Sequence, residues 1–392
     1  MKLASVRDIF GIDLRTLALF RVLLGGYLIL DLILRARDIT AHYTDFGVMP
    51  RGVLVPYLSP GSFSVHMLNG TAAFQVALFV LAGFFALMLI AGWQTRLATF
   101  ASWVLLLSLQ NRNTQILSGE DNLVMLLTFW ALFLPLGARY SIDAALDKTN
   151  AAVPNAYLSV ATFALLIQCM SVYFFSALLK SDAMWIPDGT AVYYALHLDY
   201  LGTPFGLWFR QFESLLPGLT YAVWSLELIG PILIFSPLLH RPLRAAIMAA
   251  FITLHIGLFL CLEIGIFPLV SIIMNLTFMP GWMWDRLAKA LRRDAQDGLA
   301  IWYDRDCDFC LKTGRLLKFF LFLDPVPLAP AQDAPRIGAL LTAHNSWVVT
   351  SGDGDALRWN AMRRVAGVLA AGNRADVASA GGARRSCVRL GR

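Results

Sequence analysis

Long apolar segments alternate with short polar ones along the first 280 residues of the chain. A helix needs about 20 apolar residues to cross a bilayer, because each residue adds about 1.5 Å and the hydrocarbon core is about 30 Å thick. About eight segments approach this length, the third and eighth being short: 14–34, 71–91, 96–110, 121–136, 156–179, 215–238, 243–262 and 263–279. This pattern predicts a mainly α, polytopic membrane helix bundle of about eight spans.

The apolar pattern stops near residue 284, and a different one follows. Residues 285–298 are rich in charge and predict a short helical linker that leaves the membrane. A short apolar run, a turn, a helical stretch and a second apolar run follow, and they predict a small α/β domain. We therefore divide the chain into four parts: a membrane domain at 1–284, the linker at 285–298, the α/β domain at 299–370, and an Ala/Gly/Arg-rich tail at 371–392, predicted to be mobile.

Composition and charge agree with a membrane protein. Only 15% of the residues are charged and 58% are hydrophobic, whereas ordinary globular domains are about one quarter charged. When the N-terminus is placed inside, the inner segments hold twice as many Lys and Arg residues as the outer loops, which predicts that both termini are cytoplasmic. The net charge of +6 is spread along loops and tails, so it does not indicate nucleic-acid binding. We expect a multi-pass protein of the inner (plasma) membrane, with the lipid bilayer as its partner.

Two of the five cysteines are close together in the sequence, and they lie in the predicted turn before a helix. Cys307 and Cys310 form a Cys-x-x-Cys motif between a strand and a helix, which is the thioredoxin-like arrangement. The helix N-terminus favours a thiolate at the first cysteine, and the second is one turn away and can resolve a mixed disulfide. We therefore assign Cys307 as the attacking thiol and Cys310 as the resolving thiol.

Two other interpretations of the cysteine pair remain open. The pair is half of a zinc site, or it consists of two unreactive thiols. Zinc takes four ligands, and only Cys387 and His344 follow in the sequence, at irregular spacing. We therefore expect no metal.

Ionisable residues in the apolar segments are the second candidate for function, because charges are costly in a bilayer. Arg21, Glu227, His255 and Glu263 lie in or between these segments, and each either serves a site or ties helices together. Lys180 closes the fifth apolar segment, where it is a base at a pocket mouth or a lysine that extends to the interface. Three outer loops, about 35–70, 110–121 and 180–214, add further pocket candidates: Arg112, Glu120, Asp121 and Trp185.

The stretch from Tyr303 to Cys310 resembles the DCC family of thioredoxin-like proteins, which has an Asp-Cys-x-x-Cys motif usually preceded by Tyr-Asp-Gly. The resemblance covers residues 299–370, and Arg305 replaces the usual Gly. It implies the thiol–disulfide oxidoreductase class, with a thiol protein as partner.

Residues from about 12 to 285 resemble the HTTM family, whose best-understood relatives are the vitamin K-dependent gamma-carboxylases. Three groups of stretches carry the likeness: Tyr173–Trp185 with Asp188 and Gly189; Gly119–Asp121 with Phe133–Gly137 and Ser141–Asp143; and His255 through Pro268. The resemblance implies that Lys180 is a base toward a reduced quinone, so a quinol is the candidate cofactor. The loop before the predicted fourth span lacks the His of the carboxylases, and the chain has no counterpart of their large lumenal domain.

Three functions follow from these patterns. The first is a membrane redox protein with an outward-facing pocket for a quinone-like or lipid-soluble substrate and a cytoplasmic thiol–disulfide module. The second is a membrane protein without enzymatic activity that binds a lipid or small molecule and has a vestigial thioredoxin-like tail. The third, a minor alternative, is the carboxylation of a protein substrate.

Overall fold

The computed structural model describes residues 3–58, 61–147, 155–291, 298–320, 323, 326–344, 346–351, 354–357, 360–361 and 363. The chain forms two compact units. The helical unit comprises residues 1–139 and 151–284, and the sheet unit comprises residues 140–150 and 285–392. Residues 140–150, which the sequence assigns to the membrane domain, cluster with the sheet unit. The predicted mobile tail at 371–392 lies outside the described residues, as do residues 292–297 of the linker.

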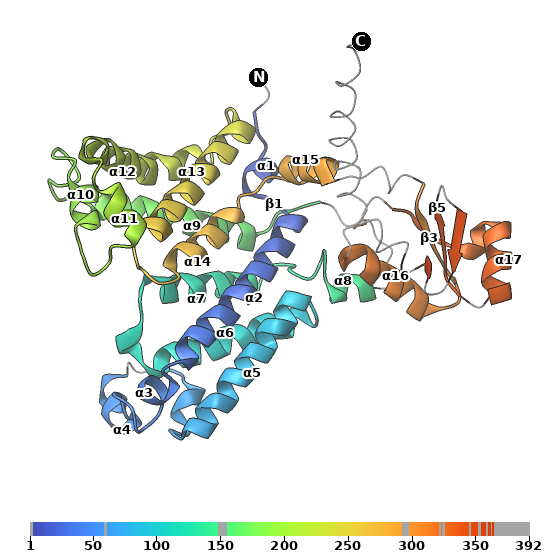
Figure 1. Ribbon diagram of the computed structural model, residues 1–392, viewed down its shortest axis with the longest axis horizontal. Helices are drawn as coiled ribbons and strands as arrows, with labels where there is room; N and C mark the ends of the chain where they lie inside the picture. The colour runs from blue at the N-terminus through green and yellow to red at the C-terminus, as the bar shows by residue number, and fades with distance from the viewer. Residues whose placement is uncertain are drawn as a thin grey trace, which may run out of the picture. The chain divides into compact units, whose positions relative to one another are not determined.

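The helical unit consists of helices joined by turns and longer loops, with a small ribbon in which β1 pairs antiparallel with β2 (Figure 1). Its elements are α1 Val6–Phe10, β1 Ile12–Asp13, α2 Leu14–Ala36, α3 Ile39–Tyr43, α4 Arg51–Leu54, η1 Val55–Tyr57, η2 Val65–Met67, α5 Ala72–Ala91, α6 Thr95–Arg112, η3 Thr114–Ile116, α7 Gly119–Ala131, β2 Ala156–Tyr157, α9 Val160–Leu179, α10 Ala191–Leu196, α11 Pro204–Phe209, η4 Glu213–Leu215, α12 Leu216–Leu233, α13 His240–Cys261 and α14 Phe267–Leu276. The helix α15, Gly281–Leu291, begins in this unit and continues past its boundary.

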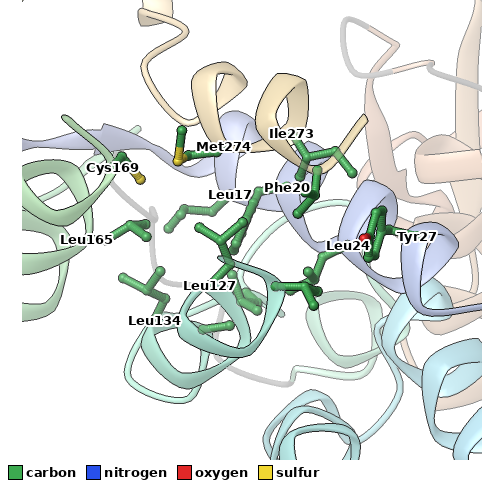
Figure 2. Packing of buried hydrophobic residues seen from close by; sticks show 14 of the residues in the cluster. Leu17, Phe20, Leu24, Tyr27, Leu127, Leu134, Leu165, Cys169, Ile273 and Met274 are labelled. Carbon is green, nitrogen blue, oxygen red and sulfur yellow. The ribbon is translucent and has the colours of Figure 1, made fainter. Parts of the chain in front are cut away.

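The core of the helical unit is built around α2. This helix begins at the capping side chain of Asp13, whose Oδ1 accepts a hydrogen bond from the N–H of Arg15 at 2.8 Å. One of its faces carries Leu17, Phe20, Leu24 and Tyr27, all at most 2% exposed. Figure 2 shows these side chains packed among residues of α7, α9 and α14 and the segment after α7, including Leu127, Leu134, Leu165, Cys169, Ile273 and Met274. A helix that is apolar and buried on several sides is typical of the interior of a helix bundle.

Five helices of the described residues are long and apolar enough to cross a membrane, and a sixth is formed if the bent pair α14 and α15 is one span. The five are α2, α5, α9, α12 extended by η4, and α13. The eight predicted spans are therefore not confirmed. The predicted third span, α6, has charged residues near both ends, and α7 and α14 have only 13 and 10 residues. The mainly helical membrane architecture itself is confirmed.

The sheet unit has four strands in the order β4-β3-β5-β6. The strand β3 pairs parallel with β4 and antiparallel with β5, and β5 forms an antiparallel hairpin with β6. The bounds of its elements are α8 Ile142–Leu146, β3 Ala300–Tyr303, α16 Asp308–Phe320, β4 Leu328–Pro330, η6 Ala331–Asp333, α17 Pro335–His344, β5 Val348–Ser351 and β6 Gly354–Leu357. The helix α16 is thus the crossover of a β-α-β unit, which is the usual way to join parallel strands.

Side chains alternate between the two faces of this sheet, as the twofold period of a strand requires. One face carries Ile301 and Val349 in an apolar cluster with Leu328, and Leu328 contacts the position of Gly314 on α16. The other face carries Trp302 and Val348, which pack against α17. The helices α16 and α17 therefore cover opposite faces, and β3 leads directly into the turn that holds the two cysteines.

Candidate functional site

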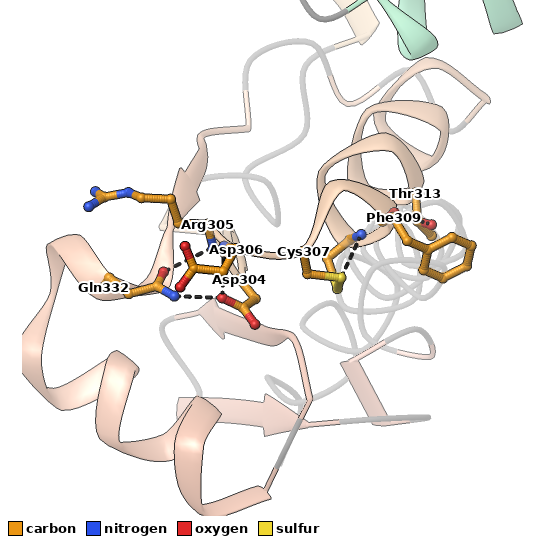
Figure 3. The surroundings of a disulfide bond; sticks show 8 residues. Asp304, Arg305, Asp306, Cys307, Phe309, Thr313 and Gln332 are labelled. Carbon is orange, nitrogen blue, oxygen red and sulfur yellow. Dashed lines mark hydrogen bonds between the residues drawn. A yellow bond between two sulfur atoms is a disulfide. The ribbon is translucent and has the colours of Figure 1, made fainter.

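The cysteine pair lies where β3 ends and α16 begins (Figure 3). Cys307 and Cys310 are joined in a disulfide, and their Cα atoms are 5.3 Å apart. The N–H of Cys310 donates to the Sγ of Cys307 at 3.2 Å and to its carbonyl oxygen at 3.0 Å. Both cysteines are half-buried, whereas Phe309 between them is 76% exposed. The first turn of the helix therefore directs an N–H donor at the sulfur of Cys307, which favours negative charge on that atom.

The turn before the cysteines is held by side chains of the sheet unit. The carboxylate of Asp304 accepts the N–H of Asp306 at 3.1 Å and the Nε2 of Gln332 at 2.6 Å. The Oε1 of Gln332 accepts the N–H of Arg305 at 3.1 Å. Arg305 is not among the residues with positive φ, so the turn does not need a glycine at this position.

Acidic residues flank the cysteines, and their charge is partly balanced. Asp308 lies 3.9 Å from the ammonium of Lys312, one helical turn further on, and Arg305 pairs with Asp333. Both pairs are exposed, and exposed pairs are worth little energy. The groups that act directly on Cys307 are therefore the backbone donors of α16.

Lys180 is the C-cap residue of α9, and its ammonium forms an ion pair with the carboxylate of Glu227 on α12. The same ammonium lies 4.5 Å from the ring centre of Trp185, within cation–π range. Both partners are substantially buried, with 20% of the Lys180 side chain and 9% of the Glu227 side chain exposed. Glu227 therefore pairs with Lys180, an arrangement that the sequence did not predict.

His255 is held in a buried hydrogen-bonded group near the middle of the unit. Its Nε2 and the hydroxyl of Tyr173 are 2.7 Å apart, and the Nδ2 of Asn275 donates to the same hydroxyl at 2.6 Å. Tyr173 also stacks on Phe251, with ring centres 3.9 Å apart. The group joins α9, α13 and α14, so it ties helices together, as polar side chains inside membrane bundles commonly do.

A third group joins the end of α2 to the start of α7. The Nε of Arg35 donates to the Oδ1 of Asp31 at 2.7 Å, and its Nη2 forms an ion pair with Asp121. The Nη1 of Arg35 donates to the hydroxyl of Tyr43 at 3.2 Å. Asp121 also accepts the N–H of Ser118 at 2.8 Å, so a single carboxylate caps α7 and holds Arg35.

Two other predicted pocket residues, Glu120 and Glu263, form none of the ion pairs described above. Glu120 is half-buried beside Gly265, and burial, with help from Asp121 and Asp31, raises its pKa. Glu263 is exposed, and its N–H donates to the carbonyl of Leu201 at 2.7 Å. These two acidic residues therefore do not belong to the ion-paired groups described above.

Arg112 is fully buried and is used to hold a loop. Its guanidinium donates to the carbonyl oxygens of Met49 at 2.9 Å and Thr44 at 3.0 Å, and it lies 3.9 Å from Asp45. Asp45 in turn is hydrogen-bonded to Arg51, which lowers the pKa of Asp45 to about 2. Arg112 thus serves as an internal anchor for the loop that follows α3.

The sequence-predicted site residues therefore fall into several separate groups. Sequence reasoning missed Asp31, Arg35 and Asn275. Asp31 and Arg35 were visible as an acid and a base four residues apart at the end of an apolar segment, a spacing that places them on one helix face. Among the described residues, no group of three His, Cys, Asp or Glu side chains is arranged to hold a metal ion.

The helices and their buried polar ties define a polytopic α-helical membrane protein. The C-terminal part of the chain adds a small sheet unit. The profile of the HTTM domain matches residues 11–282. The match covers more than half of the chain, and the chain therefore belongs to the HTTM family. No curated protein and no solved structure matches it.

Proposed function

We propose that this chain is a membrane-anchored thiol–disulfide oxidoreductase whose reactive pair is Cys307 and Cys310. The observation that supports this most directly is the position of the pair at the N-terminus of α16, inside a β-α-β unit of parallel strands. Cysteines spaced in this way beside such a unit are typical of thioredoxin-like redox sites. The proposal also rests on the resemblance of residues 299–370 to the DCC family.

The chemistry is a pair of balanced exchange steps. The thiolate of Cys307 attacks one sulfur of a substrate disulfide, so a mixed disulfide forms and the other substrate sulfur leaves as a thiolate. Cys310 then loses its proton to water and attacks the sulfur of Cys307. The Cys307–Cys310 disulfide forms, and the second substrate thiolate leaves. The substrate gains two electrons, the cysteine pair loses two, and a thiol partner protein reverses the change.

The test uses the whole chain in detergent, equilibrated with buffers of increasing reduced-to-oxidised glutathione ratio. Alkylation of free thiols followed by mass measurement reports how many cysteines are reduced. We expect two cysteines to change together with a single midpoint, and Cys310→Ser to accumulate a mixed disulfide with glutathione at Cys307. The matched control is Cys261→Ser, which removes a half-buried thiol of the helical unit and leaves both results unchanged. The proposal is overturned if Cys307 and Cys310 do not exchange with glutathione.

We infer that the helical unit contributes a second activity, the binding of a lipid-soluble, quinone-like molecule beside Lys180. The supporting observation is the buried Lys180–Glu227 pair with Trp185 against it, together with membership of the HTTM family. Lys180 acts as a base in its neutral form, which results when its proton passes along the hydrogen bond to the carboxylate of Glu227. A hydroxyl of a reduced quinone is a proton donor of suitable chemistry.

Two substitutions separate this activity from its alternatives. With dissolved oxygen as the two-electron acceptor, oxidation of a water-insoluble quinol to the quinone, with hydrogen peroxide as the other product, is abolished by Lys180→Met if Lys180 is a base. A helical unit that only binds lipid gives no oxidation above the rate without protein. Carboxylation of a protein substrate requires incorporation of carbon dioxide that depends on a reduced quinone and disappears in the same variant. Arg210→Met is the matched control, since Arg210 also forms an ion pair with an acidic residue, Asp199, but 82% of the Asp199 side chain is exposed.

The same proposal places the protein in the inner membrane and the cysteine pair on the cytoplasmic side. The excess of Lys and Arg in alternate loops supports it. Labelling of intact cells with a thiol reagent that does not cross membranes tests it directly. We expect Cys307 to be labelled only after the membrane is opened, and labelling in intact cells would reverse the orientation.

A further inference from the structure

Three exposed aromatic side chains form a continuous surface on and beside the short helix α11. Phe205, Trp208 and Phe212 are each between 42% and 51% exposed. The ring centres of Phe205 and Trp208 are 5.3 Å apart, and those of Trp208 and Phe212 are 5.1 Å apart. Side chains spaced three and four positions apart lie on the same side of a helix. We call the surface formed by these three rings the aromatic face.

The helix α11 is attached to the last turn of α13, beside which it lies (Figure 1). The N–H of Thr203 donates to the carbonyl oxygen of Cys261 at 3.2 Å, and an isolated antiparallel bridge joins Gly202 to Leu262. The two backbones also approach closely at Gly206, where a Cβ would lie 2.1 Å from the same Cys261 oxygen. The position of α11 is therefore fixed by the end of α13.

The end of α13 in turn defines a depth in the membrane. This helix has 22 residues and is apolar enough to cross a bilayer. Its length is about 33 Å, close to the thickness of the hydrocarbon core, so its last residue, Cys261, lies near the boundary between acyl chains and headgroups. Ile256, Phe259 and Leu260 in its last turns are exposed, and apolar side chains exposed on a membrane span contact lipid. The helix α11 therefore lies at the level of the headgroups.

The charged side of α11 is separate from the aromatic face. Arg210 follows Trp208 by two residues, which places it about 200° further around the helix. Its Nη1 donates to the carboxylate of Asp199 at 2.9 Å, and that carboxylate is largely exposed. One apolar side and one charged side are typical of a short segment that lies along a membrane surface.

We propose that α11 is an interfacial anchor, which lies along the membrane surface and inserts the aromatic face between the lipids of one leaflet. The aromatic face lies beside the lipid-facing surface of Phe259 and Leu260, and this position favours lipid over a protein as the molecule that covers it. Trp208 suits the boundary, because an indole has a large apolar body and one polar N–H, and tryptophan is enriched at this level of membranes. The surface is formed by residues other than the Lys180–Glu227 pair and the two cysteines, so the inference does not depend on the proposed function.

The experiment measures how close Trp208 comes to lipid. The whole chain and its Trp208→Phe variant are placed in phosphatidylcholine vesicles, and the difference in their tryptophan emission reports Trp208 alone. Bromine on the acyl chains quenches this emission on contact, and it is placed either near the headgroup or near the terminal methyl group. We expect a loss of the Trp208 emission that is greater with bromine near the headgroup. No loss with either lipid, or a greater loss with iodide in the water, overturns the proposal.

The matched control for the quenching experiment is Trp302→Phe. Trp302 belongs to the sheet unit, where its indole N–H donates to the hydroxyl of Thr350 at 3.0 Å and its ring packs against α17. The emission assigned to Trp302 in the same way is expected to show no loss with either brominated lipid. Equal losses for Trp302 and Trp208 would show that the quenching is not specific to the aromatic face, and would overturn the proposal.

A photochemical measurement tests the aromatic face without relying on tryptophan. The photoreactive amino acid benzoylphenylalanine is placed at Phe205 or, as the control, at Phe309, which is the more exposed of the two but belongs to the sheet unit. Irradiation in vesicles followed by mass measurement is expected to find lipid attached at position 205 and none at position 309. Attachment of a second copy of the chain at position 205 in place of lipid, or equal lipid attachment at both positions, contradicts the proposal.

Discussion

The ammonium of Lys180 and the carboxylate of Glu227 form an ion pair between the end of α9 and the middle of α12. The two residues are 47 positions apart in the sequence. Each is costly to bury alone, and each makes the other tolerable in an apolar setting. The pair therefore fixes how α9 and α12 pack, whatever molecule binds beside it.

Glu227→Gln is expected to destabilise the helical unit by roughly 1–3 kcal/mol, because it leaves the ammonium of Lys180 without its counter-charge. The estimate is at the low end for buried pairs since 20% of the Lys180 side chain is exposed. Thermal unfolding in detergent measures the change. The double variant Lys180→Met, Glu227→Leu recovers part of the loss, and strictly additive losses would show that the pair carries no coupling energy.

Neighbouring acidic residues at the start of α7 are expected to respond in opposite ways. Asp121→Asn weakens the ion pair with Arg35, so it lowers stability by roughly 1–3 kcal/mol. Glu120→Gln raises stability at neutral pH, since burial raises the pKa of Glu120 and the charged form is therefore disfavoured in the folded protein. The gain from Glu120→Gln disappears on acidification, when the native carboxyl is itself protonated. Equal losses from both substitutions would contradict this account.

His66 gives the helical unit a defined pH dependence. Its pKa is about 4 in the folded protein and 6.5 when exposed, so the unfolded chain takes up the proton first as the pH falls. The stability contributed by the neutral ring is present above about pH 6.5 and is lost as the pH falls toward 4, by at most about 3 kcal/mol. In His66→Gln the free energy of unfolding is expected to change less with pH across this range. The charges and polar groups that act on the ring are Arg112 and Gln75.

Two glycines near the same helix are expected to behave differently when replaced by alanine. A Cβ at Gly206 would lie 2.1 Å from the carbonyl oxygen of Cys261, where α11 meets α13, so Gly206→Ala costs roughly 1–3 kcal/mol. Gly257 lies within α13 and has nothing within 4 Å of the corresponding position, so Gly257→Ala is expected to add up to about 1 kcal/mol. The temperature of unfolding of each variant tests the two predictions. A destabilised Gly257→Ala would mean that α13 contacts a neighbour at this position.

The sequence predicted the parts of the fold that depend on local pattern. The long apolar stretches predicted α2, α5, α9 and α13, because the composition of a helix of this length is enough to show that it prefers lipid to water. The number of spans was not predictable in the same way. The helices α6, α7 and α14 are polar or short, and their burial depends on the neighbours that cover them, which a window along the chain does not include.

The candidate site was predictable only where its residues are adjacent in the sequence. Cys307 and Cys310 are one helical turn apart, so their proximity follows from the helix itself. Glu227 pairs with Lys180, Asp121 with Arg35, and His255 with Tyr173, and in each case the partner comes from a segment far away in the chain. Pairing at such distances is a property of the packed bundle. The sequence shows each acid or base within an apolar run. It does not show which of them pair between distant helices.

The sharp bend after α14 has a consequence for the redox environment of the cysteines. The axes of α14 and α15 differ by 95°, and the ten residues of α14 reach about 15 Å, half the thickness of the hydrocarbon core. With five complete crossings the two ends of the polypeptide emerge on opposite sides, and a sixth brings them to the same side. Among the crossings that the described residues offer, it is the bent pair α14 and α15 whose course decides whether Cys307 meets a glutathione-reduced compartment or an oxidising exterior.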